Sequence, residues 1–415
     1  MQFIADFHIH SKYSRATSKD MDLDHLAEWA KRKGVNLLGT GDFTHHLWLQ
    51  ELKSCLRPKE KTGLYQYRGV NFILSGEISS IYSQGGKTYR VHNLLMAPSF
   101  EVVGEINRML SFYGNISSDG RPILGLSCFR LAEELFRISD QIMLIPAHIW
   151  TPWFSVFGSR SGFDSLEEAF GKYREKITAL ETGLSSDPAM NWMISALDKF
   201  SLVSNSDSHS PSRIGREANV FNCELNYWQI KETLEKKDKS KFLYTIEFFP
   251  QEGKYHYDGH RNCKKSFHPK QTKEYNGICP VCKKPLTKGV LNRVNQLADR
   301  EEGFIPEGAI GYKSLVPLDE IIAEAEGVGK NTKTVARIYL DLVTNIGPEL
   351  ELLDRLSGEE LDLKLPEKLS SGIRRVKEKQ VELIPGYDGE YGRVKVFQEK
   401  ENRGEDGQEN QLTLF

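Results

Sequence analysis

The alternation of short apolar runs with amphipathic stretches over roughly the first 245 residues constrains the fold most strongly. Strands are predicted for QFIADFHI, VNLLGTGDF, VNFILSGEI, RVHNLLMA, QIMLIPAHI, ITALETG and SLVSNSDSH. Helices are predicted for LDHLAEWAKRKG, with Asp22 as its N-cap and Gly34 as its stop, and for NWMISALDKF. Strand–helix alternation predicts an α/β fold with a mostly parallel sheet or barrel, in which functional groups gather at the C-terminal strand ends.

The composition is that of an ordinary globular protein. With 415 residues, of which 39% are hydrophobic and 27% charged, the chain is long enough for two or three domains. The formal net charge of −2 means that any basic surface must be local. No apolar run reaches the ~18 residues of a membrane helix, and MQFIADFHIH lacks signal-peptide features. We expect a cytoplasmic, nucleoid-associated protein with no membrane partner.

Metal-ligating residue types stand where the predicted strands end. His8 and His10 follow the first strand and share one face, about 7 Å apart. Later runs end at Asp42, Glu77, His92, His148, Asp207 and His209. Imidazole and carboxylate together suit zinc, manganese or iron. The alternative, an isolated surface or core histidine, fits His92 or His148 alone but does not explain the whole series.

The segments DFHIHSKYS, GTGDFTH, SGEI, PAHIW and SNSDSHSP, in this order, resemble the polymerase-and-histidinol-phosphatase (PHP) domain over residues 1–245. The resemblance implies a distorted seven-stranded (β/α) barrel that hydrolyses phosphoesters with two or three divalent ions (Zn, Mn, Fe or Mg). It assigns the ligands in three sets: His8, His10, Glu77 and Asp207; Glu77, His92 and His148; and Asp42 with His209.

The chain departs from the PHP pattern about seven residues after His8. The family usually has Asp or His there, whereas this chain has Ser14-Arg15-Ala16. Arg15 cannot ligate a cation, because its guanidinium stays protonated. The third ion is therefore expected to be weak, absent or replaced by Arg15 acting on a phosphate.

Four residues near the last predicted strand are candidates for catalysis. Asp207 or His209 could orient the water or protonate the leaving oxygen. Arg213 and Arg216 suit a non-bridging phosphate oxygen, and the alternative is a surface ion pair with Glu217.

A cysteine cluster predicts a zinc module over residues 250–295. His260 and Cys263 form one pair and Cys279 and Cys282 the other, a spacing typical of a closed tetrahedral structural Zn site. His256 and His268 are the alternatives for the histidine ligand. Lysines of this module, among them Lys264 and Lys265, stand between aromatic residues and suit a DNA backbone, unless they form only a solvated face.

The remainder is predicted to be helical over 296–385 and to end in a flexible tail over 386–415, with a strand-like piece at GRVKVFQ. Gly327-Val328-Gly329-Lys330 lies between two helical patterns and resembles a helix–hairpin–helix, whose turn amides and Lys330 would hold a DNA phosphate. A plain turn is the alternative.

A further resemblance, carried by PAHIWTPWFS, GKYHYDGHRNC and CPVCKKPLTKGVLNRVNQLADR, is to endonuclease Q and its relatives, over residues 1 to about 350. It implies a nuclease that nicks DNA on the 5′ side of deaminated bases (hypoxanthine, uracil, xanthine) and abasic sites. Trp150, Trp153 and Phe154 follow His148 and could stack an extruded base. The alternative is that they form core at the barrel mouth.

The C-terminal peptide Gln411-Leu412-Thr413-Leu414-Phe415 resembles the sliding-clamp-binding pentapeptide of bacterial replication and repair proteins. The resemblance implies that Leu412, Leu414 and Phe415 enter a groove of the clamp while Gln411 bonds at its edge. The alternative is a tail docked on its own domain.

Two rival functions remain open at this stage. A small-molecule phosphatase of the histidinol-phosphate type would explain the barrel but not the zinc module or the tail. A non-catalytic clamp-associated DNA adaptor would explain Arg15 but not the near-complete ligand series.

Overall fold

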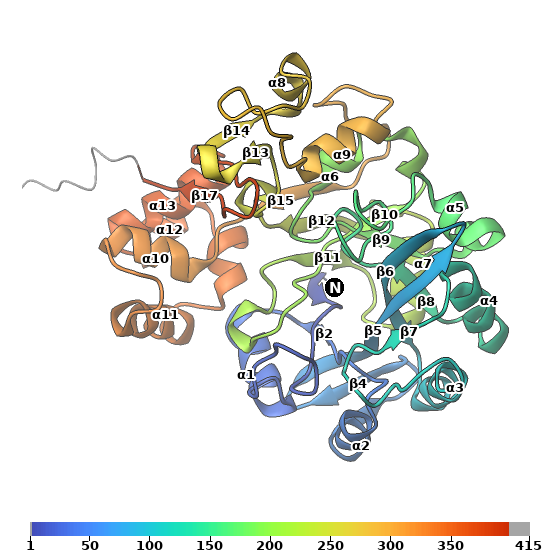
Figure 1. Ribbon diagram of the computed structural model, residues 1–415. Helices are drawn as coiled ribbons and strands as arrows, with labels where there is room; N and C mark the ends of the chain where they lie inside the picture. Colours follow the sequence, from blue (N-terminus) through green and yellow to red (C-terminus); the bar gives the residue numbers. More distant parts are fainter. Residues whose placement is uncertain (1, 398–415) are drawn as a thin grey trace, which may run out of the picture.

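The computed structural model describes residues 2–397. The predicted clamp peptide, Gln411 to Phe415, lies outside these residues. Within the described part, no helix combines the length and apolarity needed to cross a membrane. Figure 1 shows three parts: the sheet-containing N-terminal part, the zinc-module segment with α8 and α9, and a bundle of α10 to α13 beside it.

The elements have the following bounds. The strands are β1 Gln2–Asp6, β2 Leu37–Gly39, β3 Arg57–Lys59, β4 Leu64–Tyr67, β5 Val70–Gln84, β6 Lys87–Ala97, β7 Ile123–Leu124, β8 Met143–Pro146, β9 Ala179–Glu181, β10 Ser201–Val203, β11 Ala218–Asn222, β12 Phe242–Glu247, β13 Asp258–His260, β14 Lys265–Phe267, β15 Gly311–Ser314, β16 Glu382–Ile384 and β17 Arg393–Lys395. The helices are α1 Leu23–Lys33, α2 His46–Cys55, α3 Phe100–Leu110, α4 Cys128–Ile138, α5 Leu166–Phe170, α6 Pro188–Asn191, α7 Tyr227–Glu235, α8 Pro269–Glu274, α9 Val290–Leu297, α10 Leu318–Glu326, α11 Lys333–Asn345, α12 Gly358–Lys364 and α13 Glu367–Lys377.

The α/β architecture is confirmed, and every run predicted as a strand contains one. The main sheet has the order β15-β12-β11-β1-β2-β5-β4-β3, with β6 and β7 paired to β5 and β8 paired to β6. Strands β9 and β10 form a separate parallel pair. This pair is joined to the neighbouring strands by single bonds, such as Thr178 N–H to the Leu144 carbonyl and the Phe7 and Ser204 amides to the side chains of Asn205 and Asn219. Side-chain amides thus complete the circle where strand pairing stops, which makes the barrel distorted.

Aromatic packing fills the barrel below the strand ends. Phe3, Ala5 and Phe7 alternate along β1 and face a buried cluster that includes Phe221 and Phe242. The Phe221 ring stacks on Phe3 at 5.4 Å and on Phe242 at 4.7 Å between centroids. The filled interior leaves the C-terminal strand ends as the place for polar side chains.

Helix α1 forms as its sequence predicts. Leu23, Leu26 and Ala30 are buried on one face. Asp22 caps the helix by accepting the His25 N–H, and Gly34 ends it at φ 83°, in the left-handed region.

The continuous helix predicted for NWMISALDKF is wrong. Helix α6 ends at Asn191, and a 3-10 turn follows at Ser195–Leu197. Tertiary contacts interrupt the helix, because the Met193 carbonyl accepts two N–H groups from residues 299 and 300, and Asp299 accepts the Ser195 N–H.

The later segments are tied to the barrel. Strand β15, from the predicted helical region, pairs in parallel with β12, so the sheet crosses the boundary expected near residue 245. Residues 386–397, expected to begin a flexible tail, are packed: the strand predicted in GRVKVFQ is β17, and the N–H groups of Val396 and Phe397 bond to Glu324 of α10. The Gly-x-Gly turn lies between α10 and α11 as predicted.

Candidate active site

The predicted ligands come together in two groups that share Glu77. His8, His10, His148 and Asp207 follow the ends of strands as predicted, but Glu77 and His92 lie within the long antiparallel strands β5 and β6, so the prediction that they end strands is wrong. Donor atoms of His8, His10 and Asp207 lie within 4.8 Å of one another, as do those of Glu77, His92 and His148. Glu77 Oε2 lies 3.7 Å from His8 Nε2 and 3.3 Å from His10 Nε2. Glu77 Oε1 lies 2.8 Å from His92 Nδ1 and 3.1 Å from His148 Nε2. Glu77 therefore occupies the position of a bridging carboxylate between two cation sites.

The histidine rings are oriented by hydrogen bonds at their far nitrogens. Nδ1 of His8 contacts both oxygens of Glu181, at 3.0 and 3.1 Å, and Nδ1 of His10 contacts Asp42 at 2.9 Å. Nδ1 of His148 contacts the Thr151 hydroxyl at 3.2 Å. Such partners fix the tautomer and leave Nε2 free to ligate.

The site is built for positive charge. Among the described residues, His8 Nε2, His10 Nε2 and Asp207 Oδ1 are buried polar atoms with no hydrogen-bond partner. Burial alone would lower the pKa of His8, but Glu181, Glu77 and Asp207 outweigh it and raise that pKa well above its usual value. Burial would raise the pKa of Asp207, but the two histidines hold it far below. Divalent cations fit this donor set, since they satisfy the three atoms without requiring protons.

Three of the predicted ligands have strained backbones. Asp42, His148 and Asp207 adopt φ of 46°, 31° and 46°. Non-glycine residues at positive φ cost of order 1–3 kcal/mol each, and they cluster at functional sites. Gly183 makes room for His148, because a Cβ at Gly183 would lie 2.5 Å from the His148 Cβ.

Asp42 and His209, expected to share a third ion, differ from the other ligands. Asp42 belongs to neither group: its buried carboxylate accepts from the Ser11 N–H, the Ser11 and Ser14 hydroxyls and His10 Nδ1. The His209 ring lies tilted against His10, with 4.5 Å between the centroids, and its Nδ1 donates to the Asp207 carbonyl at 2.8 Å. That bond leaves Nε2 of the neutral His209 ring as an acceptor.

Two residues absent from the sequence prediction are central to the site. Glu181, at the end of β9, also accepts the His148 N–H at 2.8 Å and the Asn205 amide. Arg121, from the loop before β7, lies 3.0 Å from Glu77 Oε2. Glu181 carries the same signal as the predicted ligands, a carboxylate where an apolar run stops, whereas nothing local in the sequence marks Arg121.

Arg213, Arg216 and Lys330 converge on one cavity of about 620 Å³ that Ser185, Glu252 and Tyr391 also line. Arg213 pairs with Asp319 and Glu320 of α10 at 3.6 and 3.5 Å, not with Glu217. The Arg216 guanidinium donates to the Ser206 carbonyl, next to Asp207. Burial, with the nearby Glu320, raises the pKa of Glu252 to about 8, so this acid adds little negative charge at neutral pH.

The three aromatic residues after His148 lie in different environments. Trp150 is fully buried, and its Nε1 donates to Asn191, so the prediction that it stacks on DNA is wrong. Phe154 packs against His92 at 4.9 Å. Trp153 is 41% exposed and meets Tyr255 edge to face at 6.1 Å. Only Trp153 among the three presents a large free face.

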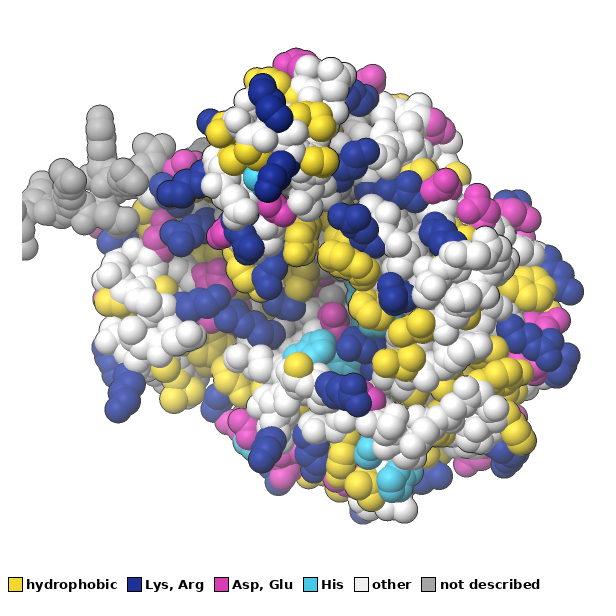
Figure 2. Space-filling view, viewed as in Figure 1, with side chains coloured by type: hydrophobic (Ala, Val, Ile, Leu, Met, Phe, Trp, Pro, Cys, Tyr) yellow, Lys and Arg dark blue, Asp and Glu magenta, His cyan; other side chains and the backbone are white. Residues whose placement is uncertain are grey.

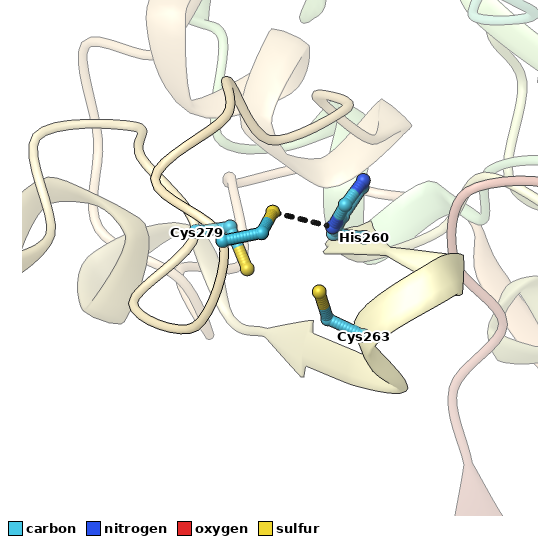
Figure 3. A group of neighbouring side chains, drawn as sticks. His260, Cys263 and Cys279 are labelled. Atoms are coloured by element: carbon cyan, nitrogen blue, oxygen red, sulfur yellow. Dashed lines mark hydrogen bonds between the residues drawn. The ribbon is translucent and has the colours of Figure 1, made fainter.

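The cysteine cluster forms as a compact group. Donor atoms of His260, Cys263, Cys279 and Cys282 lie within 4.8 Å of one another, with Cys282 Sγ 3.3 Å from His260 Nδ1 (Figure 3). Backbone N–H groups at Cys282 and Val281 lower the pKa of Cys279 to about 6. Of the two alternative histidines, His268 caps α8 and His256 lies outside the group. This arrangement fits a tetrahedral zinc ion.

Removing the metal from this cluster should unfold the zinc module and leave the barrel folded. Leu286 is one of few apolar side chains buried in the module, so ligation must supply several kcal/mol. Cys279→Ser should lose one zinc per chain and become rapidly cleaved by protease between about residues 258 and 290. Cys55→Ser, outside the cluster, is the matched control. Equal protease resistance in both variants would contradict a structural role.

The basic side chains predicted to contact DNA lie on the surface. Lys264 and Lys265 are exposed on the β13–β14 hairpin. Lys330 pairs with Glu320 at 3.0 Å, and Arg15, 80% exposed, contacts Asp119 at 3.2 Å. Figure 2 shows Lys and Arg side chains around a central hollow in which histidines are visible.

Comparisons with known proteins agree with this arrangement. Residues 317–380 match the family model of the MJ0043 C-terminal domain. The uncharacterised protein MJ0043 of Methanocaldococcus jannaschii is 33% identical over 259 residues, 60% of this chain, and the match spans only 32% of that protein's length.

Two solved structures match nearly the whole chain. The lesion-specific endonuclease PfuEndoQ from Pyrococcus furiosus is 32% identical with a TM-score of 0.87, covering 100% of both chains. Endonuclease Q in complex with a 27-mer duplex carrying an abasic lesion at the active site is 33% identical with a TM-score of 0.84, covering 96% of this chain and 98% of that one. With this identity over the full length of both chains, the chain belongs to the endonuclease Q family.

Proposed function

We propose that this protein is a metal-dependent endonuclease that hydrolyses the DNA phosphodiester on the 5′ side of a deaminated base (hypoxanthine, uracil or xanthine) or an abasic site. The family relationship supports this proposal, as does the complex of one relative with an abasic duplex. The donor set fits two divalent ions (Zn, Mn, Fe or Mg), which when bound would activate a water and neutralise charge on the attacking and leaving oxygens.

The side chains around the ligand groups have separate tasks. The bond from His209 to the Asp207 carbonyl uses Nδ1 and leaves Nε2 available. Nε2 can therefore accept a proton from the water or return one to the leaving oxygen. Arg216 is held beside Asp207 by the Ser206 carbonyl and can bind a non-bridging phosphate oxygen. Glu181 and Asp42 hold the histidine rings in place.

The cavity that Arg216 lines is the observation that carries the proposal, because the same guanidinium bonds to the Ser206 carbonyl next to the candidate ligand Asp207. It is lined by barrel residues Ser185 and Arg216, by Glu252 at the start of the predicted zinc module and by Lys330 of the Gly-x-Gly turn. An extruded nucleotide needs such a polar space next to the scissile phosphate. A small-molecule phosphatase would not need three chain segments to converge here, whereas a duplex is long enough to contact all three.

A nicking assay tests the proposal. Purified protein is incubated with Mg²⁺ or Mn²⁺ and end-labelled duplexes that carry one hypoxanthine, uracil, abasic site or normal base, with His148→Ala alongside. We expect one nick 5′ to the lesion, absent in the variant and on normal DNA. Intact DNA with every metal would refute the proposal, and hydrolysis of a chromogenic phosphomonoester would then favour a phosphatase.

Trp153→Ala should weaken binding of lesion DNA selectively. Stacking of a base on an aromatic ring contributes ~1–3 kcal/mol, so the half-saturating concentration in single-turnover nicking should rise by roughly 5- to 150-fold. Trp228 is also 41% exposed but lies on α7 beside Tyr227, whereas Trp153 follows the candidate ligand His148, so Trp228→Ala is the matched control. Equal affinity of the two variants would show that Trp153 does not contact the DNA.

The C-terminal peptide supports a second part of the proposal, recruitment by a sliding clamp. Leu412, Leu414 and Phe415 provide the apolar residues that enter a groove, and Gln411 supplies an edge contact. Replacing Leu414 and Phe415 with alanine should abolish binding to an immobilised bacterial clamp without changing nicking of short duplexes. Unchanged clamp binding would rule out this peptide.

A further inference from the structure

The loop at residues 115–122 places Arg121 inside the ligand cluster. Its Nη1 lies 3.0 Å from Glu77 Oε2, the oxygen that faces His8 and His10. The side chain is 28% exposed, whereas Glu77 is fully buried. The charge of Arg121 also acts on Asp207 and His209. Arg121 therefore stands between the buried ligands and the opening of the site.

Asp42 is already engaged by hydrogen bonds on both carboxylate oxygens, with one donor on Oδ1 and three on Oδ2. A carboxylate offers about four lone-pair positions, and Asp42 receives four donors: His10 Nδ1 at 2.9 Å, the Ser11 N–H and hydroxyl at 2.6 Å each, and the Ser14 hydroxyl at 3.0 Å. Gly120 closes the remaining space, because a Cβ there would lie 2.3 Å from Asp42 Oδ2. A cation at Asp42 Oδ2 would have to displace these groups.

Arg15 stands where the family usually has an Asp or His, and it holds the Arg121 loop in place instead of ligating an ion. Arg15 Nε contacts Asp119 Oδ2 at 3.2 Å, and Asp119 Oδ1 accepts the Arg121 N–H at 3.1 Å. The Gly120 N–H donates to the Tyr13 carbonyl, and the Thr44 hydroxyl donates to the Gly120 carbonyl at 3.1 Å. Arg121 is thus held by contacts on both sides of its loop.

We propose that Arg121 takes the place of a third metal ion and contacts a non-bridging oxygen of the scissile phosphate beside a two-ion site. The proposal rests on the proposed function. Hydrolysis forms a P–O bond from water and breaks one bridging P–O bond, whose oxygen leaves as an alkoxide and takes up a proton. Negative charge grows on the phosphoryl oxygens meanwhile. A guanidinium has five fixed donors and stays protonated, so Arg121 can keep Glu77 and also bind that oxygen.

The test combines metal counting with kinetics on Arg121→Gln, Arg121→Lys and the control Arg130→Gln, an exposed α4 arginine paired with Glu133 and Glu134. After saturation with Mn²⁺, all four proteins, the unmutated chain included, should hold two barrel ions and one zinc. Arg121→Gln should lower kcat about 100- to 1,000-fold, with the half-saturating DNA concentration changed less than about threefold. The kcat of Arg121→Lys should lie between that of Arg121→Gln and that of the unmutated protein. In a separate assay, added guanidinium should partly restore the activity of a further variant, Arg121→Ala.

The outcomes separate this inference from the proposed function. A third barrel ion in the unmutated protein would overturn it. Loss of barrel ions in Arg121→Gln in proportion to lost activity would also overturn it, since Arg121 would then only position Glu77. Unchanged kcat in Arg121→Gln would do the same. If the unmutated protein cleaves no DNA, the proposed function fails. The ion count would still show whether the barrel holds two ions or three.

Discussion

Replacing Glu77 with glutamine should remove both barrel ions and lower nicking at least about 1,000-fold. Each carboxylate oxygen serves a different group of ligands: Oε2 faces His10 at 3.3 Å, and Oε1 faces His92 at 2.8 Å and His148 at 3.1 Å. Glutamine keeps one carbonyl oxygen and puts an N–H₂ donor in the other place, which repels a cation. Ions held at these positions would stabilise the developing charge by several kcal/mol, so their loss would account for the expected decrease.

Metal content by mass spectrometry and single-turnover nicking, measured on the same preparation, check this result. Glu105→Gln, at an exposed position of α3, removes the same charge away from the ligands and should retain two barrel ions and full activity. The zinc of the cysteine cluster should stay bound in both variants. A Glu77→Gln protein that keeps both ions would show that Glu77 does not bridge them.

The clustering of the candidate ligands could be predicted in part, because several of them stand just after an apolar run, although Glu77 and His92 lie within β5 and β6. His8, His10 and Asp207 follow short strands that are buried almost throughout, so their positions follow from short apolar runs that end at the same edge of the barrel. The cysteine pairs were predictable from spacing alone. Capping of α1 by Asp22 was equally local.

Long-range contacts explain what the sequence did not reveal. Arg121 lies in a polar loop without periodicity and reaches Glu77 across 44 residues. Trp150 and Trp153 are three residues apart in an irregular segment, where spacing does not determine which side faces inward. The cavity needs residues from 184 to 392, so only the folded chain defines it. Strand β15 was hidden because its pairing with β12 decides its conformation.

Replacing Glu181 with glutamine should weaken metal binding and spare the chemistry once metal is saturating. Glu181 is fully buried and accepts from His8 Nδ1, the His148 N–H and the Asn205 amide, so it orients one ligand from each group. The side-chain N–H₂ of glutamine is a donor, so it would face one of these three donors and could not accept its hydrogen bond. Loss of such an outer partner typically costs 10- to 100-fold in metal affinity.

Titration of the metal-free protein with Mn²⁺, with nicking followed in parallel, separates affinity from rate. The Glu181→Gln protein should need about 10 to 100 times more Mn²⁺ for half-maximal activity, while kcat at saturation stays within a few-fold. Glu224→Gln, at an exposed position after β11, should match the unmutated protein. A rate that excess Mn²⁺ does not restore would place Glu181 in contact with the reacting groups. An unchanged metal requirement would mean that the His8 and His148 rings are held by their strands alone, because the Glu181 contacts would then add nothing to ligand orientation.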